Sequence, residues 1–504
     1  MKLNRVIVSL IALAVMGGAS AWAQERTNST EIRSPLGVYV HIDIEDAINA
    51  YTPPAPPTSA ELHAYLRGLY AQLLSDPAVS GLTVGRRWDN IEVAEPVDPI
   101  GDPSSYDWSY LDDVFDQANA VNKSIQLIIT PGFDAPPWLL SKISSCDGLF
   151  AKKNPGAPDD CGKVTFSGFP QQQRSDGDVL PLPWNAIYQQ AWQDFLTNLN
   201  ARYESNPAFV SVAVAGPTGP STEMILPTSA NTPTPQLGGL PADKLWAALI
   251  KHSFPDNTLY QTSDQVFIDD WDQTIDTYER IFAGLTLFLS PDAGNDLPKV
   301  VKKVKPHSDN ILFAQDCSTT NEEVSCEAKT EILSYFVNKA GPNGKSTQVG
   351  GMTASSSLTP GDISVAGVKV LTSLAPPPSP AFLGGAEFDH PVSGSNIQEE
   401  GCPSYPNSCK KLSVEEAGYH VFTVFFDGTP VATDFGGTKG PAPLQYVGVN
   451  YVDFQYAQAN PCPAKTSKKI GRTSLQDLLN LASHDLFEMA GQQTVLPPPT
   501  CDRL

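Results

Sequence analysis

The chain has 504 residues and a formal net charge of −22, with 17% charged residues and 45 prolines. This negative charge excludes strongly anionic partners, so we expect no binding to nucleic acid or to anionic membrane surfaces. The low charged fraction and abundant proline are typical of a loop-rich extracellular protein rather than of a disordered chain.

The first residues have the pattern of a secretory signal. Lys2 and Arg5 precede an apolar run from Val6 to about Met16, and the small-x-small sequence Ala21-Trp22-Ala23 follows. That run is too short for a transmembrane helix, and no later segment reaches membrane-spanning length. We therefore predict a signal peptide at residues 1–23 and one domain at 24–504, secreted or periplasmic, with a net charge of about −24.

Eight apolar, β-branched segments are predicted to be strands. They are Gly37–Ile44, Gly81–Trp88, Ser124–Gly132, the run from Phe209 in "FVSVAVAGPTGPSTEMILP", Gly284–Ser290, the segment from Thr347, Ala381–Phe388 and Leu444–Ala457.

Segments with apolar residues at three- and four-residue spacing alternate with these strands and are predicted to be helices. They cover Ala60–Leu74, Tyr110 to Val121 with Asp107 as N-cap, Trp184 to Leu199, Val266–Phe282, Glu322–Gly341, Val414–Phe426 and Leu475 to Phe487.

This alternation predicts an α/β fold, a (β/α)8 TIM barrel with long loop insertions on the catalytic face, after the third and fourth strands. An open doubly wound sheet is the lesser alternative, because no Gly-x-Gly-x-x-Gly follows the first strand.

Eight cysteines in an exported chain suggest disulfides. Spacing favours four local pairs: Cys146 with Cys161, Cys317 with Cys326, Cys402 with Cys409, and Cys462 with Cys501. Free thiols or a zinc site are the weaker alternative, because there is no Cys-x-x-Cys pair and no cysteine has a histidine nearby.

Two glutamates fall where such barrels carry their active sites, at the carboxyl ends of strands. Glu223 stands just past the fourth strand, and Glu387 ends the seventh in "GGAEFDHP". Two carboxylates across one pocket can hydrolyse an acetal, one protonating the leaving oxygen while the other attacks the anomeric carbon or stabilises its charge. The alternative for each is an ordinary solvated surface glutamate.

The sequences "GLTVGRRWDNIEV" and "YDWSYLDDVFDQANAVNKSIQLIITPGFDAPPWLL" resemble the second-strand to third-strand region of clan A glycoside hydrolases, the cellulase and β-galactosidase superfamily. The resemblance is best from Gly81 to Leu140 and positional elsewhere. It implies a secreted retaining hydrolase of a neutral oligo- or polysaccharide, with Glu223 as general acid/base and Glu387 as nucleophile.

Two departures from the clan pattern leave a second function open. Thr222 stands where the clan commonly has an asparagine, and the stretch around Tyr451 and Gln455 offers no tryptophan platform. The chain could use another polar clamp. It could equally be a catalytically inactive barrel that binds carbohydrate.

Further residues at predicted strand ends could stack on sugar rings or bind hydroxyls. They are His41, Asp43, Arg86, Trp88, Trp138 and His390, the last beside Asp389. The alternative for each is a structural role: Trp88 could be core, and Arg86 could pair with a strand-end acid. We favour Arg86 as the group that orients the strand-seven carboxylate and keeps it ionised.

A metal site is the third alternative, built from His41 and Asp43 with Asp389 and His390. Their spacing matches no common metal motif, and no strand-to-helix turn carries a Gly-x-Ser-x-Gly nucleophile elbow. We therefore expect no metal and no cofactor.

Overall fold

The computed structural model describes residues 32–98, 103–149, 158–167, 178–215, 232–233, 242–262, 264–289, 331–332, 335–336, 339, 344–349, 382–388, 444–460 and 474–494. The predicted signal at residues 1–23 lies outside these ranges. No helix in the described ranges is long and apolar enough to cross a bilayer.

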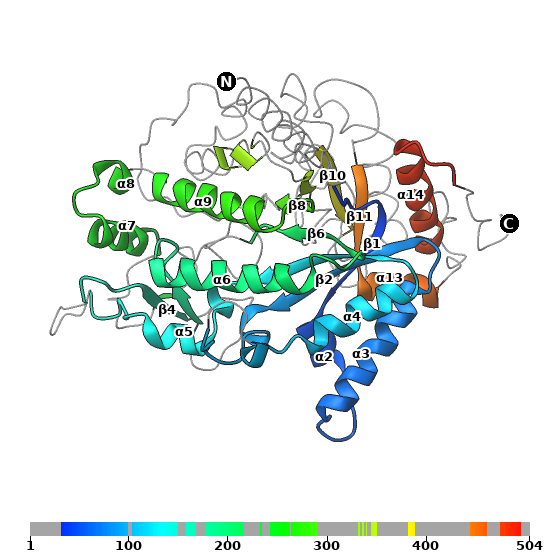
Figure 1. Ribbon diagram of the computed structural model, residues 1–504, viewed down its shortest axis with the longest axis horizontal. Coiled ribbons are helices and arrows are strands. Elements are labelled where there is room, and N and C mark those ends of the chain that lie inside the picture. Colours follow the sequence, from blue (N-terminus) through cyan, green and yellow to red (C-terminus); the bar gives the residue numbers. More distant parts are fainter. Residues whose placement is uncertain are drawn as a thin grey trace, which may run out of the picture.

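Eight parallel strands pair side by side until the last meets the first (Figure 1). The ring runs in the order β1 (Gly37–Asp43), β11 (Leu444–Asn450), β10 (Phe382–Phe388), β9 (Gly344–Val349), β8 (Thr286–Leu289), β6 (Phe209–Ala213), β3 (Ser124–Thr130) and β2 (Val79–Arg87). The predicted parallel α/β architecture is confirmed. The helices expected after β9 and β10 lie outside the described residues, so the full (β/α)8 count stays a prediction.

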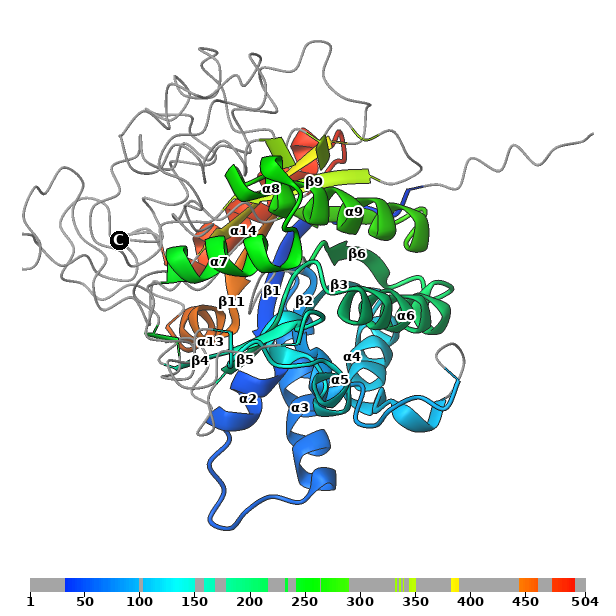
Figure 2. The ribbon, with the colours of Figure 1, turned by 90° about the vertical axis from the view of Figure 1, so that its left-hand side faces the viewer.

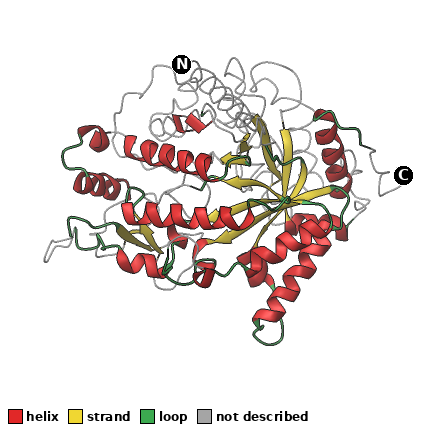
Figure 3. Cartoon of the chain, viewed as in Figure 1, coloured by secondary structure: helices red, strands yellow, loops and turns green. Residues whose placement is uncertain are grey.

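Helices surround the strands (Figures 2 and 3). They include α2 (Ile44–Ala50), α3 (Ser59–Leu74), α4 (Ser109–Ala120), α6 (Ala186–Tyr203), α9 (Gln265–Ile281) and α14 (Leu475–Met489). Helix α3 begins with a capping box between Thr58 and Glu61, which pairs two amide groups that the first turn leaves without partners. The predicted N-cap of α4 was one residue off: Trp108 holds that position, and Asp107 accepts instead from the Ser109 amide.

The two faces of each strand meet different surroundings. Val38, Val40 and Ile42 are fully buried in the large apolar core shared with the helices. A separate cluster of Ile128, Ala213 and Phe288 lies apart from that core. Strand alternation then assigns this small cluster to the inside of the ring and the large core to the layer between strands and helices.

The last strand is shorter than predicted. It ends at Asn450, whose side chain accepts from the Val452 amide and starts helix α13 (Tyr451–Ala459). The apolar run continues through both elements because the helix is also packed against the core, with Phe454 fully buried. Periodicity over so short a stretch does not separate a buried strand from a buried helix.

The insertion after β3 forms a small unit of its own. It holds α5 (Pro137–Lys142) and a three-stranded antiparallel sheet of β4 (Lys163–Ser167), β5 (Asp178–Pro181) and β7 (Thr232–Pro233), the last contributed by the segment after β6.

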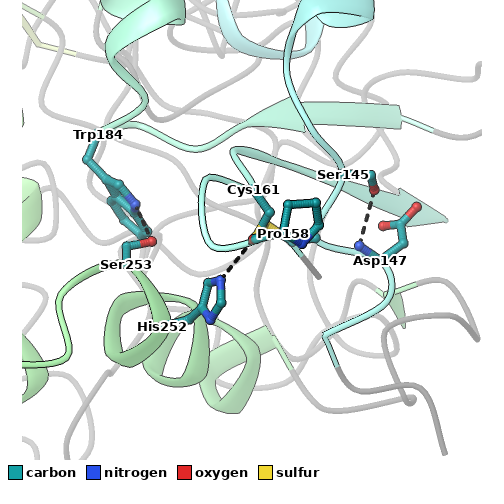
Figure 4. The surroundings of a disulfide bond; sticks show 8 residues. Ser145, Asp147, Pro158, Cys161, Trp184, His252 and Ser253 are labelled. Atoms are coloured by element: carbon teal, nitrogen blue, oxygen red, sulfur yellow. Dashed lines mark hydrogen bonds between the residues drawn. A yellow bond between two sulfur atoms is a disulfide. The ribbon is translucent and has the colours of Figure 1, made fainter. Parts of the chain in front are cut away.

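A disulfide joins Cys146 to Cys161 next to this sheet (Figure 4). The loop it closes contacts helix α7 (Ala242–Ser253) of the following insertion, where His252 Nε2 lies 3.2 Å from the Pro158 carbonyl oxygen. The bridge confirms one predicted pair. The other six cysteines lie outside the described residues, so their pairing remains a prediction.

Replacing Cys146 and Cys161 together by serine should destabilise the protein by about 3 kcal/mol, the unfolded-state entropy of a loop of this size. Differential scanning fluorimetry of the variant, beside the parent with and without reductant, measures the loss. A non-reducing peptide map that paired Cys146 with any other cysteine would contradict the prediction.

Candidate functional site

A buried ion pair stands beside the ends of β1 and β2. Arg86 Nη1 lies 2.8 Å from Glu45 Oε1, and the two side chains are 5% and 13% exposed. Asn90 Nδ2 donates to the same Glu45 oxygen at 2.7 Å. The guanidinium carbon lies 4.5 Å from the ring centre of Tyr110. Burial raises the pKa of Glu45 to about 7, while the charge of Arg86 acts in the opposite direction.

The next residue, Arg87, makes a second cluster at the end of β2. Its Nε lies 2.9 Å from Asp134 Oδ1, and its Nη2 lies 3.2 Å from Asp89 Oδ2. Thr130, the last residue of β3, donates to the other Asp134 oxygen at 2.7 Å. Burial raises the pKa of Asp134 to about 8, against Arg87 and the Thr130 hydrogen bond.

A third buried carboxyl, Glu92, lies beyond the end of β2. It is 2% exposed and accepts from Trp88 Nε1 at 2.6 Å and from the Tyr106 hydroxyl at 3.3 Å. Burial raises the pKa of Glu92 to about 7, and the two hydrogen bonds partly oppose that rise. Strands β1 to β3 are thus followed by three nearly buried carboxyls that hold protons more tightly than in water.

Glu92 and Trp138 both line a cavity of about 420 Å³ between the segment after β2, α5 and α6. Its other walls include the apolar side chains of Leu139 and Ile187. Lys142 lies 5.3 Å from the ring centre of Trp138 and pairs with Glu95. The cavity therefore offers an apolar wall with acidic groups beside it.

Five of the sequence-predicted site residues lie along β1, β2 and the segments after β2 and β3. Asp43 ends β1 and caps α2 by accepting from the Asp46 amide, and His41 lies two residues earlier. Trp138 lines the cavity just described. Trp88 is fully buried against Trp192 and Phe195, so it presents no face to a ligand in this structure.

The remaining predicted residues are only partly described. Tyr451 and Gln455 lie on helix α13 rather than on a strand end. Glu387 is the penultimate residue of β10 and pairs in register with Gly448, which pairs with Tyr39 of β1. Thr222, Glu223 and His390 lie outside the described residues.

Arg86 has a different partner from the one we favoured. Its described ion pair is with Glu45, on the strand face that packs against Tyr110 of α4. This is the structural alternative considered above, a strand-end acid held by arginine. The side chain of Glu387 lies outside the described part of the structure, so an arginine partner for it stays a prediction.

Glu45, Arg87, Glu92 and Asp134 were missed as site residues. Arg87 is the last residue of β2, and the three acids lie two to five residues beyond the ends of β1, β2 and β3. A search for charged residues just past every strand would have included them.

The metal alternative needs residues from two parts of the chain. Within the described ranges, no three histidine, cysteine, aspartate or glutamate side chains gather as a metal site would require. Asp389 and His390 lie outside those ranges, so the expectation of no metal stays a prediction.

Replacing Arg86 by methionine should cost about 3–5 kcal/mol of stability, because it leaves the nearly buried Glu45 without its cation. Arg202→Met is the matched control, since Arg202 pairs with Asp112 where the side chains are 40% and 37% exposed. That change should cost at most about 1 kcal/mol. Urea unfolding of both variants measures the difference, and equal losses would refute the buried pair.

Glu92→Gln should change how stability depends on pH. The folded-state pKa of about 7 lies above the unfolded value of about 4.3, so the folded protein holds the proton more tightly between these limits. The stability that the raised pKa of Glu92 gives the folded state is therefore fully present below about pH 4.3 and is lost as the pH rises through 7. The melting temperature of the variant, relative to the parent, should rise between pH 4.5 and 8. A constant difference across that range would contradict the assignment.

No protein-family model and no curated protein matches this chain. Among solved structures, it is similar to the crystal structure of the catalytic domain of beta-amylase from Paenibacillus polymyxa, with a TM-score of 0.39 and 9% identity. The alignment covers 83% of this chain and 94% of that one. A likeness this weak carries no argument about function, and the clan A resemblance remains a prediction from the sequence.

Proposed function

We propose that the protein is an exported retaining glycoside hydrolase of a neutral oligo- or polysaccharide, with Glu223 as general acid/base and Glu387 as nucleophile. The observation that supports it best is the closed parallel ring, because all eight strands then end at one mouth. Glu387 is one residue from the end of β10, the seventh strand of the ring in chain order. The segment that contains Glu223 begins directly after β6, the fourth.

The described course of the chain favours a shared pocket. Beyond β6, the Val214 amide donates to the Phe288 carbonyl of β8 at 2.8 Å, so the chain still follows the ring when it leaves the strand. Glu223 is eight positions beyond Ala215 in the sequence, which is within reach of a barrel mouth. Glu223 and Glu387 would then face each other across the barrel mouth.

The reaction needs two carboxyls in different protonation states. Glu223, protonated, gives its proton to the glycosidic oxygen as the bond to the anomeric carbon breaks, and the Glu387 carboxylate attacks that carbon. Water then loses a proton to Glu223 and displaces Glu387, restoring both groups. Burial near the end of β3 raises the pKa of Asp134, and an environment of this kind favours the neutral acid that the first step requires.

Glu223→Gln and Glu387→Gln should each lower kcat on an aryl glycoside by a factor on the order of 10³. Glu61→Gln is the control, because glutamine also serves in the capping box that Glu61 completes. Azide should restore turnover to Glu387→Ala, since it replaces the missing nucleophile. Full activity in both glutamine variants would end the proposal, and product of inverted configuration by NMR would end the retaining assignment.

A carbohydrate-binding barrel without catalysis is the second candidate. Two observations favour it. Trp88 is fully buried in the core, and the residues from Tyr451 form a helix that offers no tryptophan for stacking on a sugar ring. Under this alternative the parent protein would bind glycans on an array yet release no reducing ends during prolonged incubation.

A further inference from the structure

A serine, a histidine and an aspartate form a hydrogen-bonded chain on the helical layer, outside the ring of strands. His63 of α3 places Nε2 3.4 Å from Ser109 Oγ. Its other ring nitrogen, Nδ1, lies 2.6 Å from Asp113 Oδ2. Ser109 and Asp113 both belong to α4, the helix that packs beside α3.

The imidazole is held in one orientation. The side chain of Asp113 is 6% exposed. Its other oxygen, Oδ1, lies 2.7 Å from Nε and 2.6 Å from Nη2 of Arg67. The His63 ring stacks on Tyr110 with 4.1 Å between ring centres. The Asp113 carboxylate accepts a hydrogen bond from Nδ1–H, which leaves the Nε2 lone pair directed to the serine.

Ser109 has a second feature of a nucleophile. It is the first residue of α4, where the N-cap residue Trp108 makes no side-chain cap and Asp107 accepts from the Ser109 amide, at 3.1 Å. The first amide groups of a helix have no partner within it and carry partial positive charge. The amide of Tyr110, the residue after the serine, is therefore a donor for negative charge that develops on an attacked carbonyl.

One contact competes with the histidine. The Ser109 hydroxyl donates to Asp107 Oδ1 at 2.5 Å, and a hydroxyl has a single proton. Redirecting that proton to His63 requires rotation of the hydrogen alone, because the oxygen already lies within 3.4 Å of Nε2. The resting state is then the Asp107-bonded form, and the reactive form is reached by that rotation.

We propose that Ser109, His63 and Asp113 are a second hydrolytic centre, separate from the barrel mouth, that acts on small carboxylic esters. Ser109 Oγ attacks the ester carbonyl carbon and its proton passes to His63 Nε2. The carbon–oxygen bond to the alcohol breaks, and the alcohol leaves with that proton. Water then gives a proton to His63 and its oxygen to the acyl carbon. The bond between that carbon and Ser109 Oγ breaks, His63 returns the proton to Oγ, and the acid is released. Asp113 is a positioning residue.

A fluorophosphonate probe followed by peptide mapping tests this centre. The parent protein should form an adduct on Ser109, with loss of fluoride, and should hydrolyse p-nitrophenyl acetate. His63→Ala should slow both reactions by about a hundredfold or more. Asp113→Asn should also slow them. Asp107→Asn should accelerate labelling, because it weakens the competing acceptor.

Ser59 is the internal control. It is also the first residue of its helix, α3, and is exposed, but among the described residues no histidine is hydrogen-bonded to it. Labelling of Ser59 as fast as Ser109, no adduct on Ser109, or labelling unchanged in a His63→Ala variant that melts like the parent would each overturn the proposal. Glu387→Gln should leave the labelling rate of Ser109 unchanged, which separates this centre from the proposed glycosidase site.

Discussion

Each barrel strand is hydrogen-bonded to two parallel neighbours, and the chain of pairings returns from β11 to β1. A parallel strand can join such a ring only if the intervening chain crosses back over the outside, which is why helices such as α3, α4 and α6 form the outer layer. Closure also leaves no open sheet edge, and because the strands are parallel, all their carboxyl ends lie on the same side of the ring. The position of the charged clusters, and the proposal for Glu387, follow from that geometry.

The charges near the ends of β1 to β3 are paired because water is largely excluded from them. Arg86 and Arg87 are neighbours in sequence and, by strand alternation, leave β2 on opposite faces. One meets Glu45 and the other Asp134. Each pair offsets part of the cost of burying a carboxylate, yet burial still raises the pKa of both acids. Burial near the strand ends therefore raises carboxyl pKa values on both faces of the sheet.

Tyr110 connects this region with the Ser109 centre. The guanidinium carbon of Arg86 lies 4.5 Å from the centre of its ring, and the ring stacks on His63 with 4.1 Å between ring centres. The same residue therefore supports the buried Glu45 pair and fixes the imidazole that faces Ser109. The two regions share a support although their proposed reactions are different, so a substitution of Tyr110 would disturb both and would be a poor probe of either.

The sequence by itself determined the barrel strands and the long helices α3, α4, α6, α9 and α14, because apolar periodicity is a local property: β1, β2, β3 and β10 begin and end within two residues of their predicted bounds. Close spacing also predicted the Cys146–Cys161 pair, which the structure confirms. Only the tertiary structure decided that Trp88 is core, that Arg86 pairs with Glu45, and that the apolar run after Asn450 becomes a helix. These outcomes depend on which elements pack together, since burial and ion pairing join residues that local patterns treat independently. The Ser109, His63 and Asp113 chain was invisible for the same reason: Ser109 is 46 residues from His63, and the packing of α3 on α4 brings them together.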